Sequence, residues 1–510
     1  DGSGGPDSPN VDGEGWTKFS PSRDTVRIYV SASGNDRFDG RSPQRAVRTI
    51  ERGKELLRDG KPDWLLLKAG DTFNEPIGGW NKSGRSANQP MLMSSYGTGP
   101  RPKIITGGRK GLTIYGYRDV RRHVAFVGLH LEPGVVGKGN GISIVSGAVE
   151  DILFEDNYIA NFSGNVVIGG VNGDPLENVR LRRNIIVDAT GSPRTSGIFI
   201  EKLNGFLFEE NIIDRNGWDY RRGREATATI WGHNVYSQKT AQGVVVRGNL
   251  SSRASSHGWQ SRTGGIQEGN VYARNPIGLL FANVRSTNND LSREIVKGNL
   301  IVEGVDTNSD VRRGWGMHLT NLRGATVTEN IVANSLLPDR GYGISVSGGS
   351  GATVVNTLIA DNIIDDYGDN IRILPETAGD VTLRNNKISR SNNPNKSLVF
   401  HMRERNAPGV SYEGNLYSHD EDSNPFDVAG DDLSFNEWQA DYDPQGGRLL
   451  QPYVDEARSL DGFAQSRGLA DAEALFEAMR NQSRQNWDER ITTQQIIEYF
   501  REGFTLQSSS

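Results

Sequence analysis

The fold is decided by two stretches that share one layout, Ile152-Leu-Phe-Glu-Asp-Asn-Tyr-Ile159 and Val179-Arg-Leu-Arg-Arg-Asn-Ile-Ile186. In each, a short alternating run leads to an Asn that is followed two residues later by an Ile. Alternation of apolar and polar residues predicts a half-buried strand. Asparagine tolerates the left-handed backbone of a sharp corner and can hydrogen-bond a second Asn stacked on it. The two stretches therefore predict two stacked coils that carry Asn at the same corner.

The same layout recurs along most of the chain. Ten Asn residues stand in this register: Asn157, Asn184, Asn211, Asn249, Asn270, Asn299, Asn330, Asn362, Asn386 and Asn415. Their separations of 27, 27, 38, 21, 29, 31, 32, 24 and 29 residues suit one coil of three short strands per repeat. Helical repeats of this length would need two amphipathic helices each, which the frequent Gly and Asn disfavour. We therefore predict an all-β solenoid with these Asn residues in one column.

The chain divides into three parts on this interpretation. Residues 1–24 are polar and Gly-rich, which predicts a flexible N-terminal tether. Residues 25–418 form the solenoid, with the amphipathic segment Pro43 to Leu57 as a helical cap over its open end. Residues 419–510 form an irregular and α-helical extension, with helices expected over Asp471 to Arg484 and Thr493 to Phe504. These helices would cap the far end or lie along one side.

Composition narrows the class of protein. Gly 62 and hydrophobic residues at 35% of the 510-residue chain suit many tight turns around a thin core. The formal net charge of −6 argues against a nucleic-acid partner. Cysteine is absent, which excludes disulfides and thiolate chemistry, and no stretch approaches the ~20 apolar residues of a transmembrane helix. The polar opening predicts a secreted, periplasmic or outer-membrane lipoprotein of bacterial type, and a lipid anchor before residue 1 would fit the tether.

The registers and strands together resemble a known superfamily. The Asn-x-Ile registers, strands such as Gly197-Ile-Phe-Ile200, and the segment Tyr29-Val-Ser-Ala-Ser-Gly-Asn-Asp-Arg-Phe-Asp-Gly-Arg-Ser-Pro43 resemble the right-handed parallel β-helix superfamily of pectate-lyase type, over Val26 to Tyr417. The resemblance implies a right-handed parallel β-helix and a carbohydrate-active protein. That superfamily contains lyases, hydrolases, epimerases, esterases and adhesins, so the fold does not choose the activity. An Asp-Pro-His-Asp run of the alginate-epimerase kind is missing from the sequence.

Strand parity predicts which side chains point outward. In strands aligned on Gly197-Ile-Phe-Ile200, the second and fourth residues are mostly apolar and face in, so Trp259 is expected in the core. The outward third column reads Ser143, Val167, Phe199, Tyr236, Gln260, Leu280, His318, Ser345, Arg372 and Val399. The outward fifth column reads Val145, Gly169, Glu201, Gln238, Arg262, Ala282, Thr320, Ser347, Leu374 and His401. Both columns turn polar together at Glu201, Tyr236, Gln238, Gln260 and Arg262, which predicts one solvent-facing groove.

Further candidates fall on the same coils. His233 and His257 stand directly before the aligned strand in adjacent coils, so they would hydrogen-bond the backbone, bind a metal for which a third ligand is not evident, or act in catalysis. The longest coil inserts a loop from Trp218 to Arg224. Three of its side chains would bind substrate or merely anchor the loop: Trp218, Tyr220 and Arg222. Two lysines, Lys202 and Lys239, follow the aligned strands nearby.

The favoured function is a lyase that cleaves a uronate-containing, acidic polysaccharide by β-elimination. Arg262 with Gln260 or Gln238 would hold the carboxylate, and Tyr236 would protonate the leaving oxygen. The base would be one of three residues: His233, His257 or Lys239. Further along the same face, His318 and Arg372 would contact substrate.

Two alternatives remain open at this stage. A glycoside hydrolase would need two carboxyls, with Glu201 as one and Asp219 or Glu225 as the other. A non-catalytic adhesin or stalk would use the solenoid as a rigid rod. No metal site is predicted, although Asn288-Asn-Asp290 could supply oxygen ligands to Ca²⁺ without any spacing signature.

Overall fold

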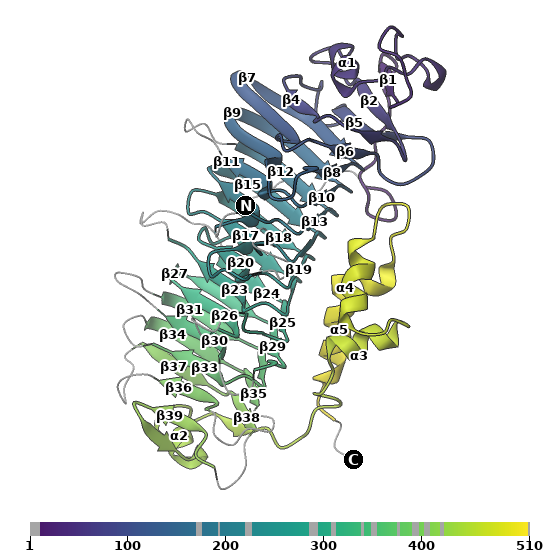
Figure 1. Cartoon of the computed structure of the whole chain (residues 1–510). Helices are drawn as coiled ribbons and strands as arrows, with labels where there is room; N and C mark the ends of the chain where they lie inside the picture. Colours follow the sequence, from purple (N-terminus) through teal and green to yellow (C-terminus); the bar gives the residue numbers. More distant parts are fainter. Residues whose placement is uncertain are drawn as a thin grey trace. The chain divides into compact units, whose positions relative to one another are not determined.

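The computed structural model describes residues 11–169, 176–191, 194–219, 227–284, 294–307, 313–337, 341–347, 354–374, 378–389, 397–401, 409–418 and 423–507. The chain forms two compact units. The first unit comprises residues 1–227, 240–245 and 481–487, and the second comprises residues 228–239, 246–480 and 488–510. Each unit is a right-handed parallel β-helix whose coils contain up to three strands, as the sequence predicted (Figure 1).

The strands of the first unit fall into three stacks. The first stack contains β4 (Gly78–Trp80), β11 (Gly164–Gly169) and β14 (Ser196–Glu201). The second contains β1 (Arg27–Val30), β2 (Trp64–Lys68), β5 (Met91–Tyr96), β12 (Leu176–Arg182) and β15 (Leu203–Glu209). The long strands β7 (Leu112–Val127) and β9 (Asn140–Glu155) run through both stacks. The third contains β3 (Thr72–Phe73), β6 (Lys103–Ile105), β8 (His130–Glu132), β10 (Tyr158–Ala160), β13 (Ile185–Val187) and β16 (Ile212–Asp214).

The second unit repeats this arrangement. Its first stack contains β17 (His233–Ser237), β20 (His257–Ser261), β23 (Ile277–Ala282), β26 (Trp315–Thr320), β30 (Tyr342–Ser347), β33 (Asp369–Ile373), β36 (Val399–His401) and β39 (Phe426–Val428), to which β40 (Asp431–Leu433) adds an antiparallel strand. Its second contains β21 (Ile266–Glu268), β24 (Glu294–Lys297), β27 (Leu322–Arg323), β28 (Ala325–Thr328), β31 (Val354–Ala360), β34 (Ala378–Arg384) and β37 (Val410–Glu413). Its third contains β19 (Leu250–Ser252), β22 (Val271–Ala273), β25 (Leu300–Val302), β29 (Ile331–Ala333), β32 (Ile363–Asp365), β35 (Lys387–Ser389), β38 (Leu416–Ser418) and β41 (Gly447–Arg448). Strand β18 (Gln242–Arg247) has residues in both units.

The predicted asparagine column exists within each unit. In the first unit, Nδ2 of Asn157 donates to Oδ1 of Asn184 at 3.0 Å, and Asn184 donates to Asn211 at 2.9 Å. In the second unit the same bond, 2.9–3.0 Å long, links each member to the next from Asn249 to Asn415. That ladder ends on the carboxylate of Asp443. Because every amide is buried, each bond satisfies groups that would otherwise cost free energy.

The left-handed corner residue is not the Asn itself but the residue before it. Asp156, Arg183 and Glu210 have φ of 60°, 50° and 53°, and Gly248 has φ of 65°. The Asn that follows is therefore selected for its side-chain ladder rather than for its backbone. This corrects the expected reason for the motif and leaves the predicted column intact.

Helices cover several edges. In the first unit, α1 (Ile50–Glu55) begins at the cap Thr49 and packs on β1 and β2, so the predicted N-terminal cap is present but shorter than expected. In the second unit, α2 (Phe435–Asp441) covers the last coil, where Trp438 stacks on Phe426 with ring centroids 4.5 Å apart. Two short 3₁₀ turns, η1 (Pro43–Arg45) and η3 (Glu489–Ile491), complete the helical elements described.

The C-terminal helices of the second unit lie against its third stack. They are α3 (Leu460–Ser466), α4 (Ala472–Arg480) and α5 (Thr493–Gly503). Arg274, which follows β22, pairs with Asp461 of α3, and Thr493 donates to the Gly248 carbonyl that precedes β19. The expected helices are therefore present, with the first ending at Arg480, and they lie along the side of this unit.

The N-terminal segment is held in place from residue 11 onward. Trp16 is 1% exposed, and the backbone N–H and hydroxyl of Thr17 both donate to the Glu155 carboxylate. Arg484 adds an ion pair to Asp12. The expectation of a flexible tether over residues 1–24 is therefore wrong for the part described, because the segment buries an aromatic ring. In the described residues, no helix is long and apolar enough to cross a membrane.

Candidate functional site

The candidate site lies on the first stack of the second unit. We call it the polar patch and define it by eight side chains: His233, Tyr236, Gln238, His257, Gln260, Arg262, His318 and Arg372. The strands pair in parallel so that the third-column residues follow one another coil by coil: Tyr236, Gln260, Leu280, His318, Ser345 and Arg372. This is the order that strand parity predicted.

The inward positions agree with the same parity. Val235, Trp259 and Leu279 are at most 1% exposed, and Phe281 is fully buried. The indole N–H of Trp259 donates to the Ser237 hydroxyl at 3.1 Å, which satisfies its polar atom inside the core. Trp259 is therefore a core residue and not a sugar platform.

The predicted alternation of inward and outward side chains is wrong at one coil. Val399 is fully buried, and Arg372 pairs with Phe400 rather than with Val399. His401, expected outward, is 2% exposed and contacts the hydroxyl of Tyr412. The error has a simple cause: three consecutive apolar residues, 398–400, carry no alternation from which a register can be read.

His233 and His257 lie side by side in adjacent coils, with their rings edge to face at 84° and centroids 4.6 Å apart. Their Nδ1 atoms are 3.1 Å apart, and their side chains are 5% and 6% exposed. Burial, together with the charges of Arg313 and Arg262, lowers the pKa of His233 to about 3. Burial also lowers the pKa of His257 well below its ordinary value. Both imidazoles are therefore neutral at neutral pH.

A buried arginine completes this cluster. Arg313 donates to the Ser256 hydroxyl, whose oxygen lies 2.7 Å from Nδ1 of His257. Burial lowers the pKa of the Arg313 guanidinium. Arg313, Ser256, His257 and His233 thus form one connected row. Arg313 was not predicted, because it stands two residues before Trp315, which holds the register position of the two histidines, and so lies outside the aligned strand.

Arg262 stands out electrostatically on the partly exposed side of the patch. Its guanidinium carbon lies 5.6 Å from the centroid of the Tyr236 ring, a cation–π contact. Among the residues described, Arg262 forms no ion pair with a carboxylate. The His233 ring lies 5.5 Å from the Tyr236 ring, so Tyr236 is held between an imidazole and a guanidinium.

A row of aromatic rings continues the patch along the stack. The Trp315 ring contacts His318 at 5.5 Å and Tyr342 at 5.6 Å, and the Arg372 guanidinium lies 4.2 Å from the centroid of the Tyr342 ring. Nε2 of His318 contacts the Ser347 hydroxyl, and burial lowers the pKa of His318 to about 4. Trp315 and Tyr342 occupy the strand-opening position of His257 in later coils, which is the signal that could have found them.

Several predicted site residues are not among the eight that define the polar patch. Glu201 and Lys202 belong to the first unit, where the Glu201 side chain lies over Gly169. Trp218 is partly exposed there, and Asp219 is 5% exposed and pairs through its backbone with Thr227. Lys239 is exposed directly after Gln238 in the second unit. Four predicted positions lie outside the described residues: Tyr220, Arg222, Glu225 and Asn288-Asn-Asp290.

Within the described part of the chain, no group of three His, Cys, Asp or Glu side chains is placed to hold a metal ion. The two stacked histidines point Nδ1 at one another rather than at a common point. Nothing in this arrangement supplies a set of ligands for Ca²⁺, which needs six to eight oxygens.

Comparisons with known proteins concern the fold. No family model matches the chain, and no curated protein matches it. Among solved structures, the chain is similar to a mannuronic acid specific polysaccharide family 6 lyase from human gut microbiota, with 13% identity, 93% of this chain and 99% of that chain covered, and a TM-score of 0.47. It is also similar to a GH136 lacto-N-biosidase from Eubacterium ramulus (13% identity, 83% and 67% covered, TM-score 0.36) and to pectate lyase Pel9A (13% identity, 86% and 85% covered, TM-score 0.32). The strand arrangement confirms the predicted parallel β-helix.

Proposed function

We propose that the chain is a polysaccharide-degrading enzyme, and specifically a lyase that cleaves a uronate-containing polysaccharide by β-elimination at the polar patch. The observation that carries the proposal is Arg262, a partly exposed guanidinium over Tyr236 without a carboxylate partner among the described residues. Arginine binds carboxylates in a bidentate geometry, so a guanidinium that no described carboxylate compensates fits an anionic substrate group. Gln260, opposite Tyr236 in the next coil, adds an amide beside it.

The proposed reaction removes the C5 proton of the uronate and breaks its C4–O bond. A base takes the C5 proton of the uronate, the C5–H electron pair forms a C4=C5 double bond, and the C4–O bond breaks. The leaving oxygen takes a proton from the Tyr236 hydroxyl. Arg262 stabilises the negative charge that develops on the carboxylate as the C5 proton leaves.

His233 fits the role of the base. Its lowered pKa keeps the ring unprotonated at neutral pH, and its ring contacts that of Tyr236. A bound carboxylate next to Arg262 would raise that pKa toward a value suited to proton abstraction. His257 holds the His233 ring through the Nδ1 contact and is a positioning residue on this proposal. Lys239, exposed after Gln238, is the alternative base.

The glycoside hydrolase alternative has less support from the geometry. It requires two carboxyls across the scissile bond, ~5 to ~9.5 Å apart. Of its candidates, Asp219 is nearly buried and pairs through its backbone with Thr227, and Glu225 lies outside the described residues. No observation favours a purely adhesive role. The lyase proposal implies an acidic polysaccharide as partner and a place of action outside the cytoplasm: secreted, periplasmic or at the outer membrane as a lipoprotein.

The test is a search for the unsaturated product. The full chain is incubated with alginate, pectate and glycosaminoglycans, and ultraviolet absorbance and reducing ends are followed together. The proposal expects both to rise on at least one substrate, to fall ~30-fold or more with Arg262→Ala, and to fall with Tyr236→Phe at similar substrate binding. Arg384→Ala, an exposed arginine at the end of β34, is the matched control and keeps wild-type turnover. Reducing ends without new absorbance would replace the lyase by a hydrolase.

A further inference from the structure

The second stack of the first unit carries an apolar column on its outer face. Its apolar members follow one another by strand pairing: Trp64, Leu92, Ala125 and Leu153. The next residue of the column is Arg180. Outward positions of a β-helix are normally polar, because they face water. Here Leu92, Ala125 and Leu153 are at most 4% exposed, with Phe19 and Trp64 packed against them. The N-terminal segment 16–20 is what covers them.

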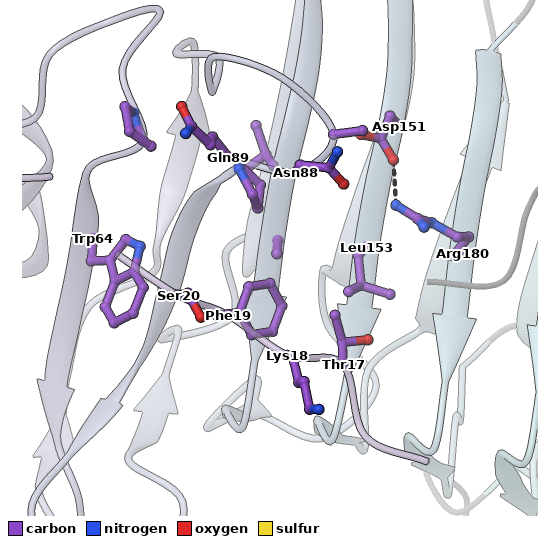
Figure 2. A pocket seen from close by; sticks show the side chains of 15 residues that line it. Thr17, Lys18, Phe19, Ser20, Trp64, Asn88, Gln89, Asp151, Leu153 and Arg180 are labelled. Atoms are coloured by element: carbon purple, nitrogen blue, oxygen red, sulfur yellow. Dashed lines mark hydrogen bonds and ion pairs between the residues drawn. The ribbon is translucent and has the colours of Figure 1, made fainter. Parts of the chain in front are cut away.

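This covering segment leaves a cavity of about 490 Å³ between itself and the strands. The volume lies within the ~300–1,000 Å³ typical of small-molecule sites. Figure 2 shows the rings of Trp64 and Phe19 toward one side and the Asp151–Arg180 pair toward the other, with Asn88 between them and Gln89 above the two rings. Aromatic faces and convergent polar groups therefore share one cavity.

The segment over the cavity is anchored before and after it. Before it, Trp16 packs on Trp487 with ring centroids 5.4 Å apart, and Thr17 is fixed to Glu155. After it, the Val26 N–H donates to the Asp63 carboxylate. A segment held at both ends defines a cavity of fixed walls rather than a gap under a loose end.

Two of the three charged groups that line the cavity, Asp151 and Arg180, neutralise one another, and the third, Lys18, is exposed. Asp151 accepts a hydrogen bond from Arg180 and lies 2.8 Å from Nδ1 of His123. These three side chains are 13–17% exposed. An anionic ligand would have to compete with Asp151 for its two partners. The cavity thus differs from the polar patch, where Arg262 lacks a described carboxylate.

We propose that this cavity is a non-catalytic glycan-binding site that takes one or two neutral pyranose rings. The apolar face of a sugar ring would stack on Trp64 or Phe19, as aromatic side chains combine a large apolar surface with a defined geometry. The sugar hydroxyls would bond to the exposed amide of Asn88, which makes no side-chain hydrogen bond to a described residue, and to free lone pairs of Asp151. This site does not depend on the lyase proposal, because its ligand is neutral and its residues lie in the other unit.

Binding of neutral oligosaccharides to the full chain tests the site. Cellohexaose, xylohexaose and mannohexaose are titrated by calorimetry and by saturation-transfer NMR. We expect at least one to bind, with affinity at least 10-fold weaker in Trp64→Ala and measurably weaker in Asn88→Ala. Arg384→Ala, at an exposed arginine outside both sites, serves as the matched control and leaves this affinity unchanged.

Three results would overturn the proposal: no binding of any of the three glycans, unchanged affinity in both cavity variants, or an equal loss of affinity in the control Arg384→Ala. Asn88 is exposed, so Asn88→Ala keeps the test decisive if Trp64→Ala fails to fold. Failure of the lyase proposal gives a different pattern, with no turnover of acidic glycans but intact binding of a neutral one.

Discussion

Arginines are treated differently in the two units of this protein. In the first unit the arginines that approach the core are paired with carboxylates: Arg101 with Asp156, Arg180 with Asp151, Arg182 with Glu155 and Glu209, and Arg183 with Glu210. In the second unit Arg274 is paired with Glu303 in the same way, but neither Arg262 nor Arg313 forms an ion pair with a described carboxylate. A desolvated charge without a partner is costly, so the paired arginines serve stability, whereas the lyase proposal assigns Arg262 its anionic partner in the substrate.

The largest expected effect comes from removing one of the arginines that are paired with carboxylates. Arg182 is 4% exposed, and its guanidinium lies 2.6 Å from Glu155 and 2.5 Å from Glu209. Arg182→Ala should destabilise the first unit by ~3–5 kcal/mol, because it leaves Glu155 buried without its counter-ion. Thermal unfolding measures this loss. A change of less than ~1 kcal/mol would show that the network is dispensable, and Arg384→Ala provides the exposed-arginine control.

Removal of Arg262, which has no described carboxylate partner, should affect activity and not stability. Arg262→Ala should cost ~2–5 kcal/mol in transition-state stabilisation on an acidic glycan, yet leave the free energy of unfolding within about 0.5 kcal/mol of wild type. Arg262→Lys keeps the charge but loses the bidentate fork, so it should recover only part of the activity. Initial rates and melting curves on the same preparations separate the two effects. Equal stability losses in Arg182→Ala and Arg262→Ala would remove the distinction drawn here.

The fold was predictable because its signal is periodic. The Asn column, the inward Trp259 and the outward order from Tyr236 to Arg372 all follow from alternation and repeat length. The left-handed residue before each Asn was not predictable, because Asp156, Arg183 and Gly248 share no side-chain chemistry. A second buried contact of the same kind, from Nδ2 of Asn165 to Oδ1 of Asn216 at 3.1 Å, was also missed. It lies outside the register that was counted.

The site was predictable only where it follows the register. Stacking of His233 on His257 required nothing more than equal positions in adjacent coils. The roles of Arg313 and of the segment over the cavity depend on where irregular backbone returns to the β-helix, as in the bond from Thr17 to Glu155, 138 residues apart. Loop paths of this kind leave no local pattern in the sequence.

Acid should weaken the second unit through its buried histidines. Burial lowers the pKa of His401 to about 4, whereas an unfolded histidine titrates near ~6.5. Below pH 6.5 the unfolded chain binds protons that the folded chain does not, so this contribution to stability is present above pH 6.5 and is lost as pH falls toward 4. His401→Gln should reduce the loss of unfolding free energy between pH 7 and pH 4.5 by about 2 kcal/mol. Identical pH slopes in denaturant titrations of both proteins would contradict this.

The smallest expected effect concerns a buried acid that, unlike Asp156, has no arginine beside it. One oxygen of Asp365 accepts a hydrogen bond from Ser389, the other has no partner among the described residues, and burial raises the pKa of Asp365 to about 7. The folded chain therefore holds this proton where the unfolded chain has lost it, so its contribution to stability is complete below pH ~3.8 and is lost as pH rises through about 7. Between pH 5 and pH 8 the wild type should lose about 2 kcal/mol from this group. Asp365→Asn should lack this loss of unfolding free energy between pH 5 and pH 8. It should therefore be the more stable protein at pH 8, as measured by urea unfolding at both pH values. If the variant keeps the wild-type dependence of the unfolding free energy on pH, Asp365 is ionised in the folded state. A buried charge of the second unit would then be compensated as the buried charges of the first unit are.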